Sequence, residues 1–462
     1  MNIHVSNTLI IENPDEEIKT WCKKNLVLPN PDYAKKARMH LWLGATPKVL
    51  SLYEIRGDTL VLPFGVLGSL PDEVKKEAAF ISDFKPIESV DYKADVALYG
   101  YQETAVKAML AAKYGILQSA AGSGKTQMGI ALAARLGRKT LWLCHTLDLV
   151  RQSRERAEQY VDKKLLGTIA EGKVTIGTGI TFATVQTMAK LNLADYKDEW
   201  DCVIVDECHR VAGSPTTVTL YQKVLNSLSA RHKYGLSATV HRADGMIKAT
   251  HALLGEVVYQ VPDEAVADKI MQVGICPVGT GTKISREALN TDGTLNYTKL
   301  ISYLCANEER NQLIAGSVEQ KPSLILSDRL EHLETLRSLL PADMRKEAVL
   351  ISGKMTTKKG KAEREKAIED MKSGKKKYLF ATYALAKEGM DIPCLERLYL
   401  TTPQKDYAVI TQSIGRIART FKGKENPIAF DFVDNIGYLV KSYKKRCATY
   451  RKNNCYFVGG EV

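Results

Sequence analysis

The sequence predicts an α/β protein in which two parallel-sheet lobes follow one another along the chain, after a small α+β accessory domain. Short apolar runs alternate with helix-like stretches from about residue 95 to 262, and the same alternation begins again near residue 305. Parallel strands joined by helices give this pattern, because the helices cover both faces of the sheet. The length of 462 residues also exceeds one ordinary core, at roughly 150 residues per domain.

The elements can be assigned in chain order. Residues 1–92 are expected to form the accessory domain, from strand-like runs such as TLIIEN and DTLVLPFG and one amphipathic helix. The first lobe is expected over 93–262, with strands YGILQSA, TLWLCH, GITFATVQT, DCVIVDE and KYGLSAT. Residues 263–304 lack a strong period and are expected to be a linker. The second lobe is expected over 305–462, with strands SLILSD, AVLISG, KYLFATY, RLYLTTP and PIAFDFVD.

Composition narrows the class of protein. The formal charge of +12, from 65 Lys and Arg against 53 Asp and Glu, favours a polyanionic partner and above all nucleic acid, although a basic surface can also serve solubility alone. Nine cysteines occur without a Cys-x-x-Cys pair, which is typical of reduced thiols. The chain has no uninterrupted apolar run of about 18 residues and no signal-like start. We therefore expect a cytoplasmic protein with no membrane contact.

The stretch SAAGSGKT, residues 119–126, follows the strand YGILQ and precedes a helix. Gly122 and Gly124 would let backbone N–H groups turn toward phosphate oxygens at the helix start. Lys125 would reach the β and γ phosphates, and the Thr126 hydroxyl would bind Mg²⁺. Ser119 stands where the strict phosphate-loop pattern has Gly, and we expect a small Ser to be tolerated there. The nucleotide-binding residues predicted from this loop are Ser119, Ala120, Ala121, Gly122, Ser123, Gly124, Lys125 and Thr126.

Two carboxylates, Asp206 and Glu207, end the strand DCVIV in the same lobe. Asp206 would hold Mg²⁺ through the water shell of the metal, and Glu207 would orient and deprotonate the attacking water. An Asp-Glu pair after a strand is more often a solvated turn. Its occurrence together with a phosphate loop favours hydrolysis of a nucleoside triphosphate instead.

These residues, with Ser-Ala-Thr at 237–239 and QSIGRIAR at 412–419, resemble the superfamily 2 helicases, whose two lobes are RecA-like. The resemblance extends to Gln102, to LCHTLDLVRQ and TVQT in the first lobe, and to LISG and ATYALAKEGMDIP in the second. SATVHRADG is similar to the branch that includes the XPB-type and UvsW-like phage branch-migration helicases. Tyr99 and Gly100 depart from the family, which often has Arg and Pro there, and Cys208 replaces the commoner Ala.

The resemblance implies ATP as the nucleotide, Mg²⁺ as its cofactor and a set of further site residues. Ser237, Ala238 and Thr239 would couple hydrolysis to strand motion, although capping of a plain strand end by hydroxyls is the alternative. Arg416 and Arg419 would stabilise the γ-phosphate from the facing lobe, the alternative being a surface salt-bridge face. Gln102 would contact the adenine, and Gln412 would be a further catalytic residue. Gly389 and Asp391 would bind the nucleotide and couple it to nucleic acid.

Tracking of a nucleic-acid backbone needs hydroxyls, cations and N–H groups on both lobes. The candidates are Thr146, Arg151, Thr184 and Gln186 in the first lobe and Lys354 in the second. Residues 354–377 carry ten Lys or Arg against four acidic residues, a pattern that an amphipathic helix with a solvated face also explains. The basic, Tyr-containing stretch 441–452 fits either phosphate contact or a packed helix end.

The sequence therefore predicts an ATP-dependent DNA helicase that acts as a monomer on forked or branched DNA or on single-strand/duplex junctions. The branched-DNA part comes from the family resemblance. A translocase on double-stranded DNA that separates no strands shares the motor motifs, and an RNA-directed helicase is a further alternative. A nucleotide-gated binding protein would not need Glu207, Arg416 and Arg419, and a small-molecule phosphoryl transferase would not need the second lobe.

Overall fold

The computed structural model describes residues 1–94, 96–120, 122–240, 245–266, 270–353, 355, 357–386, 390 and 392–459, without the side chains of 358, 361 and 386. The predicted site residues Ala121, Lys354, Gly389 and Asp391 lie outside this set. The chain divides into two compact units, residues 1–120 with 124–265, and 121–123 with 266–462. In the described parts, no helix combines the length and apolar character needed to cross a membrane.

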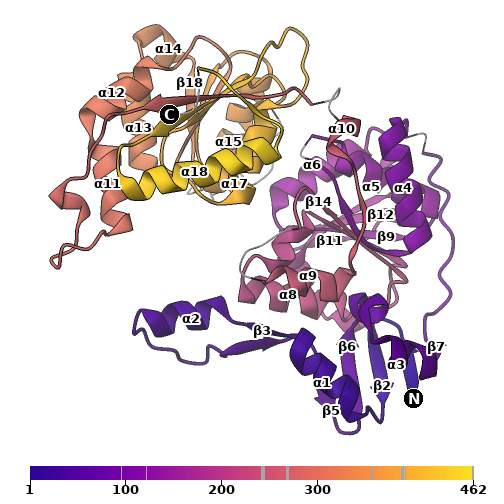
Figure 1. Ribbon diagram of the computed structural model, residues 1–462. Helices are drawn as coiled ribbons and strands as arrows, with labels where there is room; N and C mark the ends of the chain where they lie inside the picture. The colour runs from indigo at the N-terminus through magenta and orange to yellow at the C-terminus, as the bar shows by residue number, and fades with distance from the viewer. Residues whose placement is uncertain are drawn as a thin grey trace. The chain divides into compact units, whose positions relative to one another are not determined.

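The N-terminal domain is built on a five-stranded sheet in the order β5-β6-β2-β1-β7 (Figure 1). Alternate residues of β2 and β6 face the core, so that Leu9 pairs with Leu62 and Ile11 with Leu60, all of them buried. The strands are β1 (Asn2–Val5), β2 (Thr8–Glu12), β5 (Glu54–Arg56), β6 (Thr59–Pro63) and β7 (Ala79–Ser82), with helices α1 (Glu16–Asn25), η1 (Phe64–Ser69) and α3 (Asp72–Glu77). A separate ribbon pairs β3 (Val27–Pro29) with β4 (Val49–Ser51) and is joined by α2 (Pro31–Arg38).

The first lobe has an eight-stranded sheet in the order β11-β10-β12-β9-β13-β14-β8-β15, in which the β10–β11 pair is antiparallel and the other pairs are parallel. Its strands are β8 (Tyr114–Gln118), β9 (Thr140–Cys144), β10 (Leu166–Ala170), β11 (Lys173–Thr175), β12 (Ile180–Thr184), β13 (Cys202–Asp206), β14 (His232–Ser237) and β15 (Val257–Gln260). Its helices are α4 (Gly100–Ala112), α5 (Lys125–Leu136), α6 (Leu147–Ala157), η2 (Lys163–Leu165), α7 (Val185–Met188), η3 (Leu193–Tyr196), η4 (Cys208–Ala212), α8 (Pro215–Leu225) and α9 (Ile247–Leu254).

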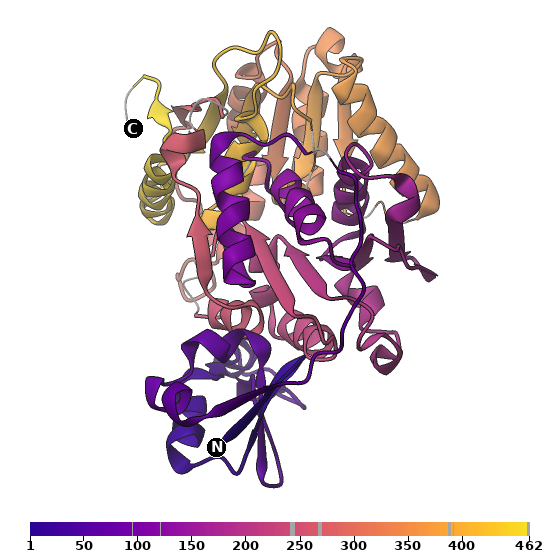
Figure 2. The ribbon, with the colours of Figure 1, turned by 90° about the vertical axis from the view of Figure 1, so that its right-hand side faces the viewer.

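The N-terminal domain and the first lobe share one hydrophobic core and lie side by side in both views (Figure 2). A Cβ at Gly65 would lie 2.4 Å from the backbone nitrogen of Gly255, so the two backbones touch. The buried Lys233 ammonium donates to the carbonyls of Asn7 at 3.0 Å and Leu225 at 2.9 Å, which joins the domain to β14 and α8. The accessory domain is therefore packed onto the lobe rather than tethered to it.

The second lobe has a seven-stranded sheet in the order β18-β19-β17-β20-β21-β16-β22, with parallel pairing throughout the described strands. Its strands are β16 (Gly274–Gly279), β17 (Ser323–Ser327), β18 (Ala348–Ile351), β19 (Tyr378–Thr382), β20 (Arg397–Leu400), β21 (Ile428–Val433) and β22 (Tyr456–Phe457). Its helices are η6 (Arg286–Ala288), α11 (Tyr297–Ala306), α12 (Glu308–Gly316), α13 (Leu330–Leu339), α14 (Ala342–Lys346), α15 (Lys358–Lys372), α16 (Tyr383–Ala386), α17 (Tyr407–Ile417) and α18 (Gly437–Lys452), and α10 (Asp263–Val266) precedes the lobe.

The predicted fold class is confirmed: two parallel-sheet lobes in tandem follow an α+β region. Inside the segment 263–304, which was expected to be a linker, β16 pairs along its whole length with β21 of the second sheet. The domain boundaries at 92, 262 and 304 stay a prediction. The stretch 441–452 forms the end of α18, and Tyr443, Arg446 and Tyr450 in it are buried, as in a packed helix end.

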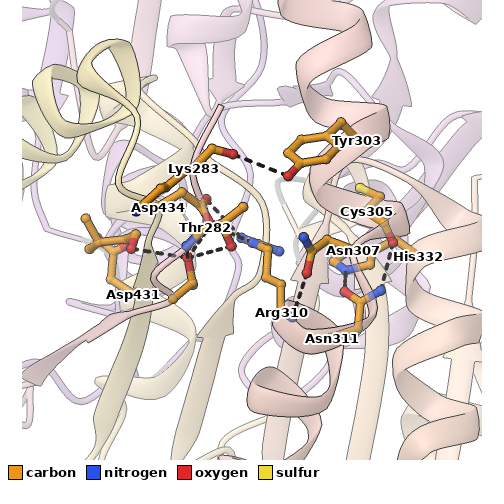
Figure 3. Close-up of polar contacts among 12 residues, drawn as sticks. Thr282, Lys283, Tyr303, Cys305, Asn307, Arg310, Asn311, His332, Asp431 and Asp434 are labelled. Atoms are coloured by element: carbon orange, nitrogen blue, oxygen red, sulfur yellow. Dashed lines mark hydrogen bonds and ion pairs between the residues drawn. The ribbon is translucent and has the colours of Figure 1, made fainter. Parts of the chain in front are cut away.

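A buried polar network lies at the carboxyl edge of the second sheet (Figure 3). Arg310 of α12 binds Asp434, just after β21, through Nε to Oδ1 at 2.7 Å and Nη2 to Oδ2 at 3.2 Å. Both side chains are fully buried. A buried ion pair of this kind is tolerated when each charge is hydrogen-bonded, and removing one partner would leave the other uncompensated. Arg310 and Asp434 thus tie α12 to the end of β21.

Candidate nucleotide site and motor elements

The polar ends of three neighbouring strands of the first lobe meet at one edge of its sheet. β14 lies between β13 and β8, and all three are parallel. Asp206 at the end of β13 is level with Leu236, and Ser237 is level with Gln118, the last residue of β8. Ligands of parallel sheets bind outside the carboxyl ends of the strands. The predicted phosphate loop, acidic pair and Ser-Ala-Thr segment therefore come together at a binding edge.

The loop after β8 has the backbone that a phosphate cradle requires. Gly122 and Gly124 both have φ of 85°, a left-handed conformation that costs little only for glycine. Gly124 is the N-cap of α5, so the first N–H groups of that helix are available to an anion. Ser119 does not need this freedom, because its N–H donates to the Ser237 carbonyl at 3.0 Å as a continuation of the sheet. The Ser at this position is compatible with the cradle.

Lys125 is the first residue of α5 and is largely buried. Its ammonium donates to the carbonyls of Ser119 and Ala120, each at 3.2 Å, so the side chain folds back over the loop. These two bonds satisfy a buried cation within its own loop. A phosphate bound at the loop would offer the same ammonium a charged acceptor, which is a stronger partner than a carbonyl.

Gln102 lies against the same loop. Its Oε1 accepts from the Tyr99 N–H at 3.0 Å, which caps the start of α4. A Cβ at Gly124 would lie 2.4 Å from Gln102 Nε2, so the amide occupies the space that the glycine leaves. Gln102 is thus placed beside the predicted phosphate loop, and its contact with adenine stays a prediction.

Asp206 is 4% exposed and is held on both oxygens. Oδ1 accepts from the Glu207 N–H at 2.9 Å, and Oδ2 accepts from the Ser153 hydroxyl of α6 at 3.1 Å. Burial raises the pKa of Asp206 above its usual range, and the neighbouring Glu207 carboxylate raises it further. A cation at this position would relieve both effects. Ser153 was not identified from the sequence, because a serine within a helix carries no signal of its own.

Glu207 has φ of 47°, in the left-handed region that non-glycine residues rarely occupy. Backbone strain of this kind costs of order 1–3 kcal/mol and is concentrated at functional sites. The conformation brings Glu207 Oε2 within 3.3 Å of His209 Nδ1. His209 Nδ1 also lies 3.0 Å from the Ser237 hydroxyl, which donates to the Thr239 carbonyl at 2.7 Å. His209 therefore links Glu207, by this 3.3 Å contact, to Ser237, by a hydrogen bond.

The residues present fit a nucleotide with Mg²⁺ on structural grounds. The two left-handed glycines leave a cradle at a helix N-terminus, and the buried Asp206 carboxyl has a raised pKa that a cation would lower. Mg²⁺ in phosphoryl-transfer sites is bound by one or two protein oxygens together with substrate phosphates. Thr126, the second residue of α5, and Asp206 are the residues that would hold it.

The predicted nucleic-acid contacts of the first lobe follow β9 and β12, which are adjacent parallel strands. Thr146 caps α6 by accepting from the Leu149 N–H at 3.4 Å, and Thr184 caps α7 by accepting from the Thr187 N–H at 3.3 Å. Gln186 donates to the His145 carbonyl at 3.0 Å, which links the two segments. Arg151 pairs with Glu171 at 3.6 Å. Thr146, Thr184 and Gln186 therefore lie near one another after the adjacent strands β9 and β12. Each of the four predicted residues already has a hydrogen-bond or ion-pair partner within the lobe.

In the second unit, Gln412, Arg416 and Arg419 lie on or directly after α17. Arg416 Nη1 donates to the Met390 carbonyl at 3.0 Å. The Arg419 carbonyl accepts from Lys424 Nζ at 2.7 Å, and burial lowers the pKa of Lys424 to about 8. These bonds hold the end of α17 and the following turn in one arrangement.

Comparisons with known proteins agree with this geometry. The family described as "Type III restriction enzyme, res subunit" matches residues 95–242, and "Helicase conserved C-terminal domain" matches residues 306–421. A protein named "Putative ATP-dependent RNA helicase" of Acanthamoeba polyphaga mimivirus is 27% identical over 88% of this chain and 82% of its own length. The DNA 3'-5' translocase XPB2 of Sulfurisphaera tokodaii is 23% identical over 78% of this chain and 84% of its own length. A "Probable helicase" of Escherichia phage T5 is 25% identical over 73% of this chain and 72% of its own length.

Solved structures show the same fold. Dbp5 of S. cerevisiae, bound to RNA and ADP BeF3, aligns with a TM-score of 0.55 and 18% identity over 78% of this chain and 89% of that one. A fragment of a putative HsdR subunit of a type I restriction enzyme from Vibrio vulnificus YJ016 aligns with a TM-score of 0.54 and 18% identity over 72% of this chain and 63% of that one. Two helicase-type domain matches in tandem, on two parallel-sheet lobes with the phosphate loop and acidic pair at one edge, identify the chain as a member of the superfamily 2 helicases.

Proposed function

We propose that this superfamily 2 motor acts on DNA and uses ATP to unwind or remodel forked or branched DNA. The observation that carries the motor assignment is the meeting of Lys125, Asp206, Glu207 and Ser237 at the carboxyl edge of one sheet, with His209 bonded to Ser237. Nucleic acid as the partner is supported by the charge of +12, and DNA in particular by a relative named as a DNA translocase. A second relative is named as an RNA helicase, so RNA is the alternative substrate.

The proposed chemistry assigns one task to each group. Lys125 leaves the carbonyls of its own loop and binds the β and γ phosphates, and Gln102 contacts the adenine. Glu207 orients and deprotonates the attacking water. Thr126 and Asp206 would hold Mg²⁺, which when bound would neutralise charge on the phosphate oxygens. Arg416 and Arg419, with Gln412 beside them on α17, supply positive charge in the transition state.

Stimulated hydrolysis tests the proposal. The wild type and Lys125→Ala are assayed for ATP hydrolysis with no nucleic acid, single-stranded DNA, duplex, fork, four-way junction and the matching RNA strands, each at two salt concentrations. Lys107→Ala is the matched control, since that side chain is 71% exposed on α4. We expect forks or junctions to stimulate the wild type most, less strongly at the higher salt, and Lys125→Ala to be inactive. Stimulation by RNA alone would refute the DNA assignment. If DNA stimulates hydrolysis, a strand-displacement assay on the fork distinguishes a helicase that unwinds DNA from a translocase that does not.

A further inference from the structure

The N-terminal domain carries a segment that no motif accounts for. We name residues 30–48 the Trp42 arm; it contains α2 and the loop that returns to β4. Figure 1 shows α2 and its ribbon extending away from the five-stranded sheet of the domain. None of the eight residues of α2 is buried, and the loop that follows it to residue 48 contains no buried residue either. Most helices of a folded protein bury one face, so this arm lacks the packing that would explain its presence.

The base of the arm is nonetheless firmly built. Asn30, 2% exposed, accepts from the Asp32 N–H at 3.0 Å and donates from Nδ2 to the Pro47 carbonyl at 2.7 Å. Its backbone N–H donates to the Lys48 carbonyl at 3.1 Å. One side chain thus caps α2 and closes the two ends of the arm together. The two ends of the arm are thus held together at its base.

The loop after α2 presents an aromatic ring. Trp42 is 87% exposed, and Met39 and Leu41 beside it are 53% and 52% exposed. Gly44 has φ of 51°, and a Cβ there would lie 2.7 Å from Trp42 Cζ3, so the edge of the indole rests against the glycine. The loop is held back to α2 by a bond of 2.7 Å from Lys36 Nζ to the Thr46 hydroxyl. An indole placed in this way leaves most of its surface to solvent.

The charge of the arm indicates what covers that ring. Four cations stand in residues 31–48 against one acidic residue, and they are Lys35, Lys36, Arg38 and Lys48 against Asp32. Lysines are depleted at the cores of protein–protein interfaces, whereas cations around an aromatic ring are typical of surfaces that bind unpaired nucleotides. The phosphates would meet the cations and a base would meet the ring.

We propose that the Trp42 arm binds an unpaired nucleotide of the nucleic-acid substrate, with Trp42 stacked on the base and Lys35, Arg38 and Lys48 around the adjoining phosphates. The inference rests on the proposed function only in taking nucleic acid as the substrate. It assigns to the accessory domain a contact with unpaired bases at forks and ends, separate from the nucleotide edge of the first lobe.

Binding by the full chain without ATP tests this site. Fluorescence anisotropy is measured for single-stranded DNA, a fork with unpaired arms and a blunt duplex with the wild type, Trp42→Ala and Trp42→Phe. Base–aromatic stacking predicts a loss of roughly 5- to 100-fold for Trp42→Ala on single strands and forks, and little change on the blunt duplex. Trp42→Phe should recover most of the loss. Phe80→Ala is the matched control, an aromatic 44% exposed on β7 outside the arm.

Two further readouts decide between the possible results. A 2-aminopurine base in the single-stranded arm should be quenched by the wild type and by Trp42→Phe but not by Trp42→Ala, and Arg38→Glu should weaken binding and flatten its salt dependence. The proposal would be overturned if the wild type and Trp42→Ala bound the fork and the single strand equally well. It would also be overturned if Trp42→Ala changed only the self-association of the protein. If Lys125→Ala stops hydrolysis while the arm still binds, the two proposals stand separately. A wild type that binds no nucleic acid would refute the proposed function itself.

Discussion

His209 Nδ1 lies 3.0 Å from the Ser237 hydroxyl, and this contact joins the acidic pair after β13 to the end of β14. The Ser237 hydroxyl proton is used in the bond to the Thr239 carbonyl at 2.7 Å. His209 must therefore donate from Nδ1, which also faces Glu207 Oε2 at 3.3 Å. A change at the Glu207 carboxylate would thus be felt at Ser237, whose carbonyl accepts from the N–H of Ser119 at the start of the phosphate loop.

Replacing Ser237 by Ala should separate hydrolysis from strand motion. The variant loses the acceptor for His209 but keeps Lys125, Asp206 and Glu207, so we expect DNA-independent ATP hydrolysis to stay within about threefold while strand displacement falls roughly 2- to 30-fold. Both rates are measured on the same fork substrate, with Ser227→Ala, a partly exposed serine after α8, as the control. An equal decrease in the two rates would show that the contact supports the site as a whole.

The change Glu207→Gln should stop turnover without preventing nucleotide binding. Gln keeps the shape of the side chain in its left-handed backbone position but cannot accept the proton of the attacking water. We expect kcat to fall by roughly 10²–10⁴-fold while the Kd for ATP changes little. Glu256→Gln is a suitable control, because that carboxylate is 69% exposed. Near-normal turnover in Glu207→Gln would place the general base elsewhere.

The phosphate loop should respond very differently to two small substitutions. Ser119→Gly should change the Kd for ATP by less than about threefold, because the Ser119 N–H already pairs in the sheet and its φ is not positive. Gly124→Ala should weaken binding by at least about tenfold, since a Cβ at φ of 85° would meet Gln102 Nε2 at 2.4 Å. Isothermal titration measures both. Much tighter binding by Ser119→Gly would show that Ser119 impairs the cradle.

The second lobe should lose stability as the pH falls, because of His332. The imidazole is buried, donates from Nε2 to Asn311 Oδ1 and accepts at Nδ1 from the Ser327 hydroxyl, each at 2.9 Å, so it is satisfied only when neutral (Figure 3). Burial lowers the pKa of His332 to about 3. Between pH 6.5 and 3 the unfolded chain then binds more protons, and the contribution to stability, complete above pH 6.5, decreases by of order 1.4 kcal/mol per pH unit.

Urea unfolding at several pH values measures this effect against a variant that does not titrate. His332→Gln retains a donor and an acceptor, so the stability advantage of the wild type over His332→Gln should shrink as the pH is lowered from about 7 to about 5. His40→Gln, at an exposed histidine of the N-terminal domain, is the matched control. An advantage that is constant over this pH range would mean that His332 does not stay neutral in the folded chain.

The sequence by itself determined the fold class and predicted the phosphate loop, because the signals for both are local. A run of apolar residues defines each strand, and the loop at 119–126 consists of neighbours along the chain. It also indicated that the acidic pair would lie beside the loop, since parallel strands end at one edge. The roles of Gln412, Arg416 and Arg419 stay predictions, and so do the nucleic-acid contacts.

Only the tertiary structure decided which distant residues touch. Ser153 on Asp206, His209 on Ser237 and the pairing of Arg310 with Asp434 join segments whose separation along the chain carries no periodic signal. β16 becomes part of the second sheet because β21 offers its open edge, although its own sequence has no strong period. Nothing in the sequence indicated that Trp42 is exposed, because a tryptophan is ordinarily expected in a core. Only the packing shows that nothing in the described chain buries it.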